Sequence, residues 1–298
     1  MKKLDLKIGY ICNNNCDFCI QGEEKRKKYI PRTLDEIKNI LYNEFQKKAR
    51  FLTITGGEPT LHNTLIPTIR YAKSLGYLSI NIQSNGQNFS NINLCKALVS
   101  AGANLFEPSI HGFKKETHDF LVKTSGAWEK VVLGIMNLKK LGQKVIINSV
   151  ITKQNYKEIP KLALFLVKLK VNYFQFAFPH IGGSAMKNWR EIIPTKTEVM
   201  PYIKMGLDIA REAGIEARTE AIPFCFMQGY EYALTEQYLV ETSVFDEAYI
   251  LNSFNDYRKN QGKRKQEKCK TCIMFYKCEG PWKEYPDLFG WDEFIPIN

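Results

Sequence analysis

The sequence has no long apolar run: no stretch approaches the roughly 20 consecutive residues that a membrane-spanning helix needs. No apolar signal region follows the charged start Met1–Asp5. There is also no low-complexity linker, no internal repeat beyond an alternation of strands and helices, and no RNP motif of an RNA-binding domain. These absences predict a cytoplasmic protein with no membrane partner.

The composition is that of an ordinary globular protein. A chain of 298 residues with 44% hydrophobic residues can form one large domain, or one domain with an appendage. The net charge of +11 comes mainly from lysine, most densely in Lys25–Lys28 and in Arg258–Lys270. A basic chain can attract nucleic acid, nucleotides or acidic peptides, but a lysine-rich solvated surface is the simpler interpretation. Nucleic acid is therefore a possible partner that we do not favour.

Eight cysteines are present, and seven of them fall into two groups. Clustered cysteines in a long cytosolic chain bind metal more often than they form disulfides. The eighth, Cys95, lies in an amphipathic helical stretch and is expected to be a buried thiol.

The first group, Cys12, Cys16 and Cys19, follows the apolar run Leu4–Ile11. This spacing lets one short loop turn three sulfurs toward a common point. Three thiolates are one ligand short of a closed four-coordinate site, and an iron–sulfur cube held by three keeps one iron open for a small molecule.

The second group is Cys269, Cys272 and Cys278, and Cys225 is its only sensible fourth member. Four thiolates complete a tetrahedral set, either for an iron–sulfur cluster or for structural zinc. Because Cys225 is distant in sequence, this grouping is itself a prediction about the fold.

Predicted strands and helices alternate six times along the first part of the chain. The strands are Leu4–Ile11, Phe51–Thr55, Tyr77–Gln83, Asn104–His111, Lys144–Thr152 and Asn172–Phe178. Short connections with a helix between successive strands favour right-handed parallel crossovers, hence an α/β fold. Six units are too few for a closed eight-stranded barrel, so we expect a partial (β/α)6 barrel over residues 1–193 and a cysteine-bearing extension over 194–298.

Five polar or glycine-rich motifs each follow a predicted strand, where barrels of this type place their chemistry. They are the first cysteine loop, Gly56-Gly57-Glu58-Pro59, Ser84-Asn85-Gly86, Ser109–Gly112 and Pro179–Gly183. His111 and His180 belong to this edge as well, but a histidine there is at least as often structural.

The CxxxCxΦC pattern, in which Phe18 is the aromatic residue, together with Gly56-Gly57-Glu58-Pro59 resembles the radical S-adenosylmethionine (radical SAM) superfamily. The resemblance implies a partial (β/α)6 barrel and a 4Fe–4S cluster held by three cysteines. It further implies that the open iron chelates S-adenosylmethionine, and that an electron from the cluster breaks a carbon–sulfur bond to release a 5′-deoxyadenosyl radical. A low-potential donor such as ferredoxin or flavodoxin would supply that electron.

The resemblance also implies cofactor contacts. The GGEP turn would bind the methionine amino group, with Glu58 as the counter-charge, and two further strand ends would contact the rest of the cofactor. Simple turn formation would explain the serine and asparagine equally well. The implied cofactor-binding set is Phe18, Gly56, Gly57, Glu58, Pro59, Ser84, Asn85 and Ser109.

The CxxCx5C pattern of the second group resembles part of the SPASM extension, which carries auxiliary 4Fe–4S clusters. Trp282 stands where the full motif has its next cysteine, so the resemblance implies only one auxiliary cluster, with zinc as the alternative. Four cysteine ligands leave no open iron, which favours an electron-transfer or structural role. We expect the aromatic tail, including Trp282, Trp291 and Phe294, to pack around this site.

The resemblance implies an oxidoreductase that abstracts hydrogen from a substrate. A peptide is the first expectation, although no peptide-recognition domain precedes the barrel. The alternatives are a small molecule, a nucleotide or RNA, and, outside enzymes, a zinc-stabilised nucleic-acid-binding protein. No cobalamin-binding domain is evident, which argues against cobalamin-dependent methyl transfer.

Overall fold

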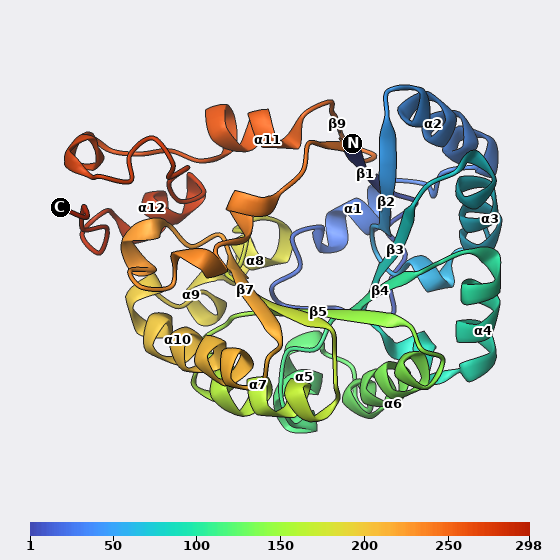
Figure 1. Cartoon of the computed structure of the whole chain (residues 1–298), viewed down its shortest axis with the longest axis horizontal. Coiled ribbons are helices and arrows are strands. Elements are labelled where there is room, and N and C mark those ends of the chain that lie inside the picture. Colours follow the sequence, from blue (N-terminus) through green and yellow to red (C-terminus); the bar gives the residue numbers. More distant parts are fainter.

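The computed structural model describes residues 1–298, and its centre is one curved sheet of nine strands (Figure 1). The order across the sheet is β7-β6-β5-β4-β3-β2-β1-β8-β9. Every neighbouring pair is parallel except β8 and β9. The strands are β1 (Lys2–Lys7), β2 (Ala49–Thr55), β3 (Ser79–Ser84), β4 (Leu105–Pro108), β5 (Lys144–Val150), β6 (Tyr173–Ala177), β7 (Glu216–Glu220), β8 (Thr242–Phe245) and β9 (Ile250–Leu251).

The longer helices cover the outer, convex face of this sheet (Figure 1). They are α2 (Leu34–Gln46), α3 (Leu65–Leu75), α4 (Ile92–Ala101), α6 (Ala127–Lys140), α7 (Ile159–Lys168) and α10 (Lys196–Glu212). The capping box at the start of α2 is present, with Thr33 and Glu36 bonded reciprocally. The sheet does not close, because β7 and β9 are its two edges. The prediction of an α/β partial barrel is therefore confirmed.

All six predicted strands exist, but the sequence missed three others. β7 reads Glu-Ala-Arg-Thr-Glu, which is too polar to stand out as a strand. β8 is four residues long, and it pairs in parallel with β1, more than 230 residues earlier in the chain. Residues 194–298 thus add strands at both ends of the sheet formed by residues 1–193.

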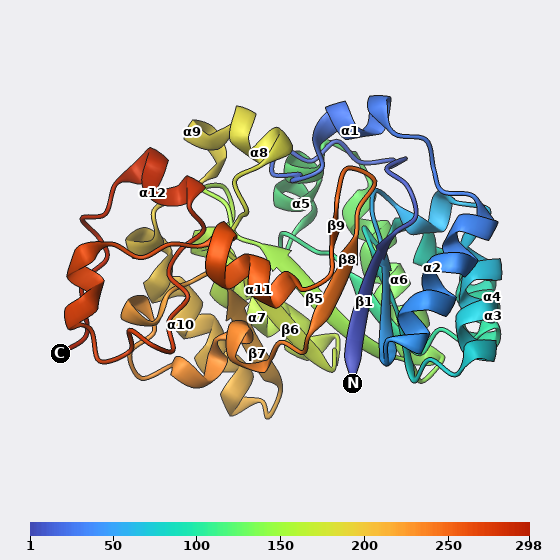
Figure 2. The same cartoon turned by 90° about the horizontal axis from the view of Figure 1, so that it is seen from above.

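Short helices lie at the edge where the parallel strands end (Figure 2). They are α1 (Gly22–Lys28), which follows the first cysteine loop, and α8 (Gly183–Lys187) with α9 (Trp189–Ile192), which follow β6. On the same side, α5 (Lys115–Val122) follows β4, and α12 (Glu284–Phe289) belongs to the C-terminal segment. None of the helices is long and apolar enough to cross a membrane.

Strand alternation separates an apolar convex face from a polar concave face. In β1, Leu4 and Leu6 are completely buried against the helices, while Lys3 and Asp5 line a central cavity. That cavity has a volume of about 900 Å³ and extends from the first cysteine loop down the concave face. Cys95 is buried in the core, as predicted.

Candidate active site

The first cysteine loop leaves β1 and lies at the mouth of the central cavity, which Cys12, Cys16 and Cys19 all line. Two backbone hydrogen bonds tie the loop to the end of α5: Asn15 N–H donates to Val122 at 3.0 Å and Asp17 N–H donates to Leu121 at 3.3 Å. These hydrogen bonds therefore hold the loop against the edge of the barrel.

Two neighbouring helices hold the other side of this loop. The Arg26 guanidinium of α1 donates to the backbone oxygen of Asn14 at 2.6 Å. The backbone N–H of Ser184 in α8 donates to the carbonyl of Cys19 at 2.8 Å. Burial raises the pKa of the Cys12 and Cys16 thiols, so metal binding, which needs thiolates, would release protons.

The turn after β2 packs directly on the chain that leads into the cysteine loop. Gly57 N–H donates to Gly9 at 2.8 Å, and Glu58 N–H donates to Ile11 at 2.7 Å. A Cβ on Gly56 would come within 2.1 Å of the Gly9 oxygen, and one on Gly57 within 2.3 Å of the Ile11 oxygen. Glycine is thus required at both positions by the close approach of two backbones.

Glu58 is completely buried and does not line the central cavity. Its carboxylate accepts hydrogen bonds from the Thr60 backbone at 3.0 Å, the Ser84 hydroxyl at 2.8 Å and the Asn85 backbone at 2.7 Å. Burial raises the pKa of Glu58, and these hydrogen bonds oppose the shift. The carboxylate therefore joins the ends of β2 and β3, and its contact with the cofactor ammonium group stays a prediction.

The other expected cofactor contacts lie around the same cavity mouth. Asn85 reaches the Cys12 sulfur with its side-chain amide at 3.8 Å, and Ser109 lines the cavity one strand further on. Phe18 packs edge-on against His111, with ring centroids 4.6 Å apart. Gly56, Gly57 and Ser84 line the cavity as well, whereas Pro59 is buried in the turn.

His111 is part of the support for this edge. Its ring nitrogen Nδ1 accepts the backbone N–H of Val150 at 3.1 Å, and burial holds its pKa well below the ordinary value. A neutral, hydrogen-bonded imidazole of this kind positions β5 against β4.

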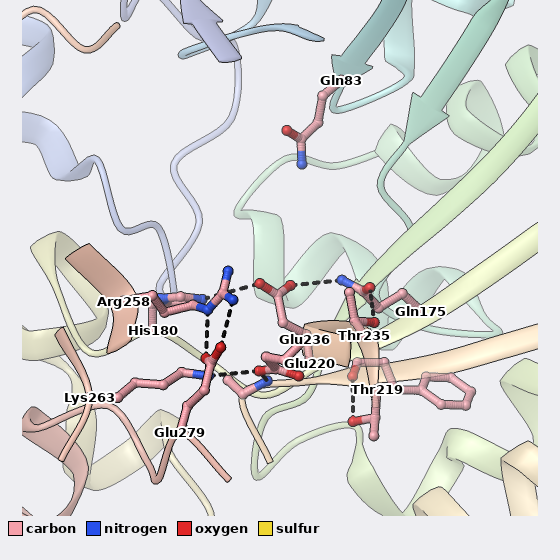
Figure 3. A network of polar contacts seen from close by, with 12 residues as sticks. Gln83, Gln175, His180, Thr219, Glu220, Thr235, Glu236, Arg258, Lys263 and Glu279 are labelled. Carbon is pink, nitrogen blue, oxygen red and sulfur yellow. Dashed lines mark hydrogen bonds and ion pairs between the residues drawn. The ribbon is translucent and has the colours of Figure 1, made fainter. Parts of the chain in front are cut away.

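A second polar cluster, not anticipated from the sequence, lies where β6 and β7 end (Figure 3). Glu220 accepts a hydrogen bond from Gln175 at 2.7 Å and faces His180, with Nε2 and Oε1 3.8 Å apart. Behind it, Lys263 contacts Glu236 at 2.9 Å and Glu279 at 3.0 Å. Arg258 also holds Glu279, at 2.6 Å, so the two basic residues here are already paired.

The four C-terminal cysteines line one small, mostly apolar cavity, which Trp291 and Phe294 also line. Cys225 lies in a short 3-10 helix, Phe224–Phe226, that comes back beside the CxxCx5C segment. Burial, with the nearby Cys278, raises the pKa of Cys225 to about 12. Trp282 lines the central cavity instead, where its ring lies 4.6 Å from that of His180.

The donor sets suit iron–sulfur chemistry by residue type. All eight cysteines are free thiols. The first three line the central cavity, and the C-terminal four line a second cavity that no carboxylate lines. No group of three or more His, Cys, Asp or Glu side chains is arranged to hold a metal ion as it stands.

Comparison with known proteins agrees with this geometry. The model of the radical SAM superfamily matches residues 6–166, more than half of the chain. A probable GTP 3′,8-cyclase of Saccharolobus islandicus is 29% identical over 194 residues, which cover 64% of this chain and 61% of the relative. One from Sulfurisphaera tokodaii is 26% identical over 185 residues, covering 61% and 58%. The match thus spans about three fifths of these curated relatives.

Two solved structures share the fold at low sequence identity. Streptococcus suis SuiB bound to S-adenosylmethionine has a TM-score of 0.69 and 18% identity, covering 94% of this chain and 72% of SuiB. Native anSMEcpe with bound AdoMet has a TM-score of 0.67 and 16% identity, covering 100% and 93%. The family match, the CxxxCxΦC loop and the open barrel agree: this chain belongs to the radical SAM superfamily, a family of iron–sulfur enzymes.

Proposed function

We propose that this enzyme cleaves S-adenosylmethionine reductively at the mouth of the central cavity and abstracts hydrogen from a peptide bound deeper in that cavity. Cys12, Cys16 and Cys19 hold the catalytic 4Fe–4S cluster, which when bound supplies the electron for cleavage. The electron itself comes from a low-potential donor such as ferredoxin or flavodoxin.

The protein's part in this reaction is to orient the cofactor. The Gly56-Gly57 turn lets the cofactor approach the backbone closely, and Asn85 and Ser109 offer polar groups beside it. Glu58 holds Ser84 and Asn85 in place from behind, and we retain its contact with the ammonium group as part of the proposal. Phe18 and Pro59 shape the two turns that enclose the site.

The observation that carries the peptide assignment is the chemistry of the cavity wall on the concave face of the sheet. Glu107, Glu220, Gln83 and Gln175, from four different strands, line it. Two carboxylates repel a triphosphate, whereas amide and carboxylate side chains match the hydrogen-bonding groups of a peptide. The fold itself accommodates peptides in other proteins, since SuiB was solved with its precursor peptide SuiA.

The second candidate substrate is a nucleotide. The relatives named as probable GTP 3′,8-cyclases favour it, and Lys3, Lys7 and Arg26 also line the cavity. However, Lys7 is paired with Asp5 at 3.0 Å, and Arg26 is bonded to the backbone of the cysteine loop. Lysine and arginine free to bind phosphate are therefore few, and the peptide is the better match.

We further propose a SPASM-like site at Cys225, Cys269, Cys272 and Cys278 that binds a second 4Fe–4S cluster. Support comes from the apolar cavity that the four thiols share. With four cysteine ligands no iron is open to substrate, so the role is electron transfer or structural. Zinc is the alternative occupant.

The test uses reconstituted protein under anaerobic conditions with S-adenosylmethionine and dithionite. We expect 5′-deoxyadenosine to acquire deuterium from a peptide fraction of the host cell grown in D2O, and none from deuterated GTP. Transfer from GTP and not from peptides would establish the nucleotide alternative. If alanine at all three N-terminal cysteines left 5′-deoxyadenosine formation intact, the assignment of the catalytic cluster would be overturned.

A further inference from the structure

Three carboxylates from strands far apart in the sheet face the same central cavity. Asp5 lies in β1, Glu107 in β4 and Glu220 in β7, and all three line the cavity. Burial raises the pKa of Glu107, and the negative charges of Glu220 and Asp5 raise it further. Both other carboxylates therefore disfavour the charged form of Glu107.

Of the three, only Glu107 has no close basic partner. Asp5 is paired with Lys7, whereas Glu107 has no basic group within 4.0 Å, and Lys3 acts on it only at longer range. Glu220 faces His180 at 3.8 Å, and although burial opposes the shift, the positive charges of His180, Lys263 and Arg258 lower its pKa.

Arg258 and Lys263 act on Glu220 only at longer range, because their direct contacts are with Glu279 and Glu236. Figure 3 shows the Glu220 carboxylate between His180 and Gln175, on the side of the cluster that faces Gln83.

The same wall also has hydrogen-bond acceptors without donors. Asn81 is only 4% exposed; its amide nitrogen donates to Glu107 at 2.7 Å, while its oxygen Oδ1 has no partner. The Oδ1 oxygen of Asn148, on β5, is unpartnered as well. The second oxygen of Glu107 receives only a 3.5 Å contact from Gln83. A buried acceptor left unpaired costs free energy, which a ligand with several donors would recover.

We propose that this wall, formed by Asn81, Glu107, Asn148 and Glu220, is a subsite for a positively charged hydrogen-bond donor of the substrate, an ammonium or guanidinium group. A lysine or an arginine side chain of the peptide supplies it. The inference rests on the proposed peptide substrate, and it places a basic residue at or next to the residue that loses hydrogen. The positive charge of such a group complements the carboxylates of the wall, and its several N–H donors complement the unpaired acceptors.

The first experiment tests the subsite without turnover. n-Butylammonium and n-butylguanidinium are titrated into the reconstituted, S-adenosylmethionine-bound enzyme by ligand-observed NMR, with neutral N-butylurea of similar shape as the comparison. We expect both cations to bind at least tenfold more tightly than the urea, and the tighter cation identifies the preferred side chain. Equal binding of all three would overturn the subsite.

Isosteric variants locate the binding. Glu107→Gln should weaken cation binding about tenfold or more and leave urea binding unchanged, because a charge-assisted hydrogen bond is lost. Glu220→Gln should act in the same direction and serves if the first variant folds poorly. Glu216→Gln is the matched control, since Glu216 lies on the same strand as Glu220 but outside the cavity. Unchanged cation affinity in both cavity variants would overturn the proposal.

A final arm separates this inference from the proposed function. The deuterated peptide fraction is used before and after acetylation of lysine and blocking of arginine. We expect both treatments together to abolish deuterium transfer. Undiminished transfer would overturn the subsite and leave the peptide function standing. Cation binding without transfer from any peptide would leave the subsite standing and overturn the peptide function.

Discussion

The backbone N–H of Asn85 donates to the Glu58 carboxylate at 2.7 Å, so the turns after β2 and β3 form one unit. The side-chain amide of the same asparagine reaches the Cys12 sulfur at 3.8 Å. A buried carboxylate thus sets the position of a residue that contacts a cysteine of the first group.

Replacing Glu58 with glutamine tests this unit. The backbone N–H groups of Thr60 and Asn85 each donate to a different oxygen of Glu58, and glutamine would replace one of these oxygens with an NH2 group. One N–H would then lose its acceptor, so we expect the free energy of unfolding to fall by about 1–3 kcal/mol. If Glu58 also contacts the cofactor ammonium group, calorimetry should show S-adenosylmethionine binding weakened by roughly tenfold to a hundredfold. Unchanged affinity in a folded, iron-loaded variant would rule out that contact.

Alanine at Cys12, Cys16 and Cys19 together should abolish 5′-deoxyadenosine formation under dithionite, because no thiolate remains to hold the catalytic cluster. The same variant should still bind about four irons after reconstitution, at the C-terminal site. Iron analysis and Mössbauer spectra provide the measurement. Zinc without iron in this variant would show that the C-terminal site is purely structural.

Alanine at Cys269 and Cys272 should disrupt the C-terminal site and spare the N-terminal one. The N-terminal cluster and uncoupled 5′-deoxyadenosine release should persist, because these cysteines line a separate cavity, whereas product formation should stop. Product formation at the wild-type rate would contradict an electron-transfer role. Cys95→Ala is the control, since Cys95 is buried in the core and belongs to neither group.

Gly57→Ala should lower iron content at the N-terminal site and weaken cofactor binding, because the added Cβ would come within 2.3 Å of the Ile11 carbonyl that leads into the cysteine loop. Gly182→Ala is a suitable control, because its Cβ would approach the Ile20 side chain at 3.2 Å and no backbone atom closer than 3.9 Å. Equal iron content in the two variants would show that the close backbone approach is unimportant for the loop.

Acid should destabilise the fold through His118. Burial lowers the pKa of this histidine to about 4, so between pH 6.5 and 4 the unfolded chain binds a proton that the folded chain does not. Stability therefore falls as pH decreases through this window, by about 3 kcal/mol at most from this group. Denaturant titrations of the apoprotein at pH 7 and 5 should show the loss, and His118→Asn should reduce it. If the variant loses as much stability between pH 7 and pH 5 as the unchanged protein, another group causes the loss, and the neighbouring buried His111 is the first candidate.

The sequence predicted the barrel strands and the edge where they end, because both signals are local. An apolar run followed at once by Cys12 or by Gly56 identifies a strand and its functional turn within ten residues. β8 has no such signal, because its place beside β1 is decided by pairing across most of the chain.

The sequence analysis missed the cavity carboxylates Glu107 and Glu220 for a related reason. Glu107 is the single acidic residue of β4 and Glu220 one of two in β7, and in such short strands they look like solvent-facing positions. The available signal was the alternation within β1 and β3, where Lys3 and Asp5, and then Asn81 and Gln83, alternate with apolar residues. That pattern indicates a polar concave face, but only the curvature of the sheet shows which of these side chains meet. For Glu58 the sequence motif was recognisable, but its burial was not, because burial depends on the surrounding Thr60 and Ser84, whose hydroxyls donate to its carboxylate.

The pairing of β1 with β8 also bears on how the protein matures during synthesis. Until residues 242–245 leave the ribosome, one side of β1 has no partner, and the strand that carries the first cysteine loop is an exposed sheet edge. An edge strand is prone to pair with other chains, and the first cysteine loop, which we propose receives iron, is attached to this strand. We therefore expect iron delivery to follow, rather than precede, the emergence of residues 242–245.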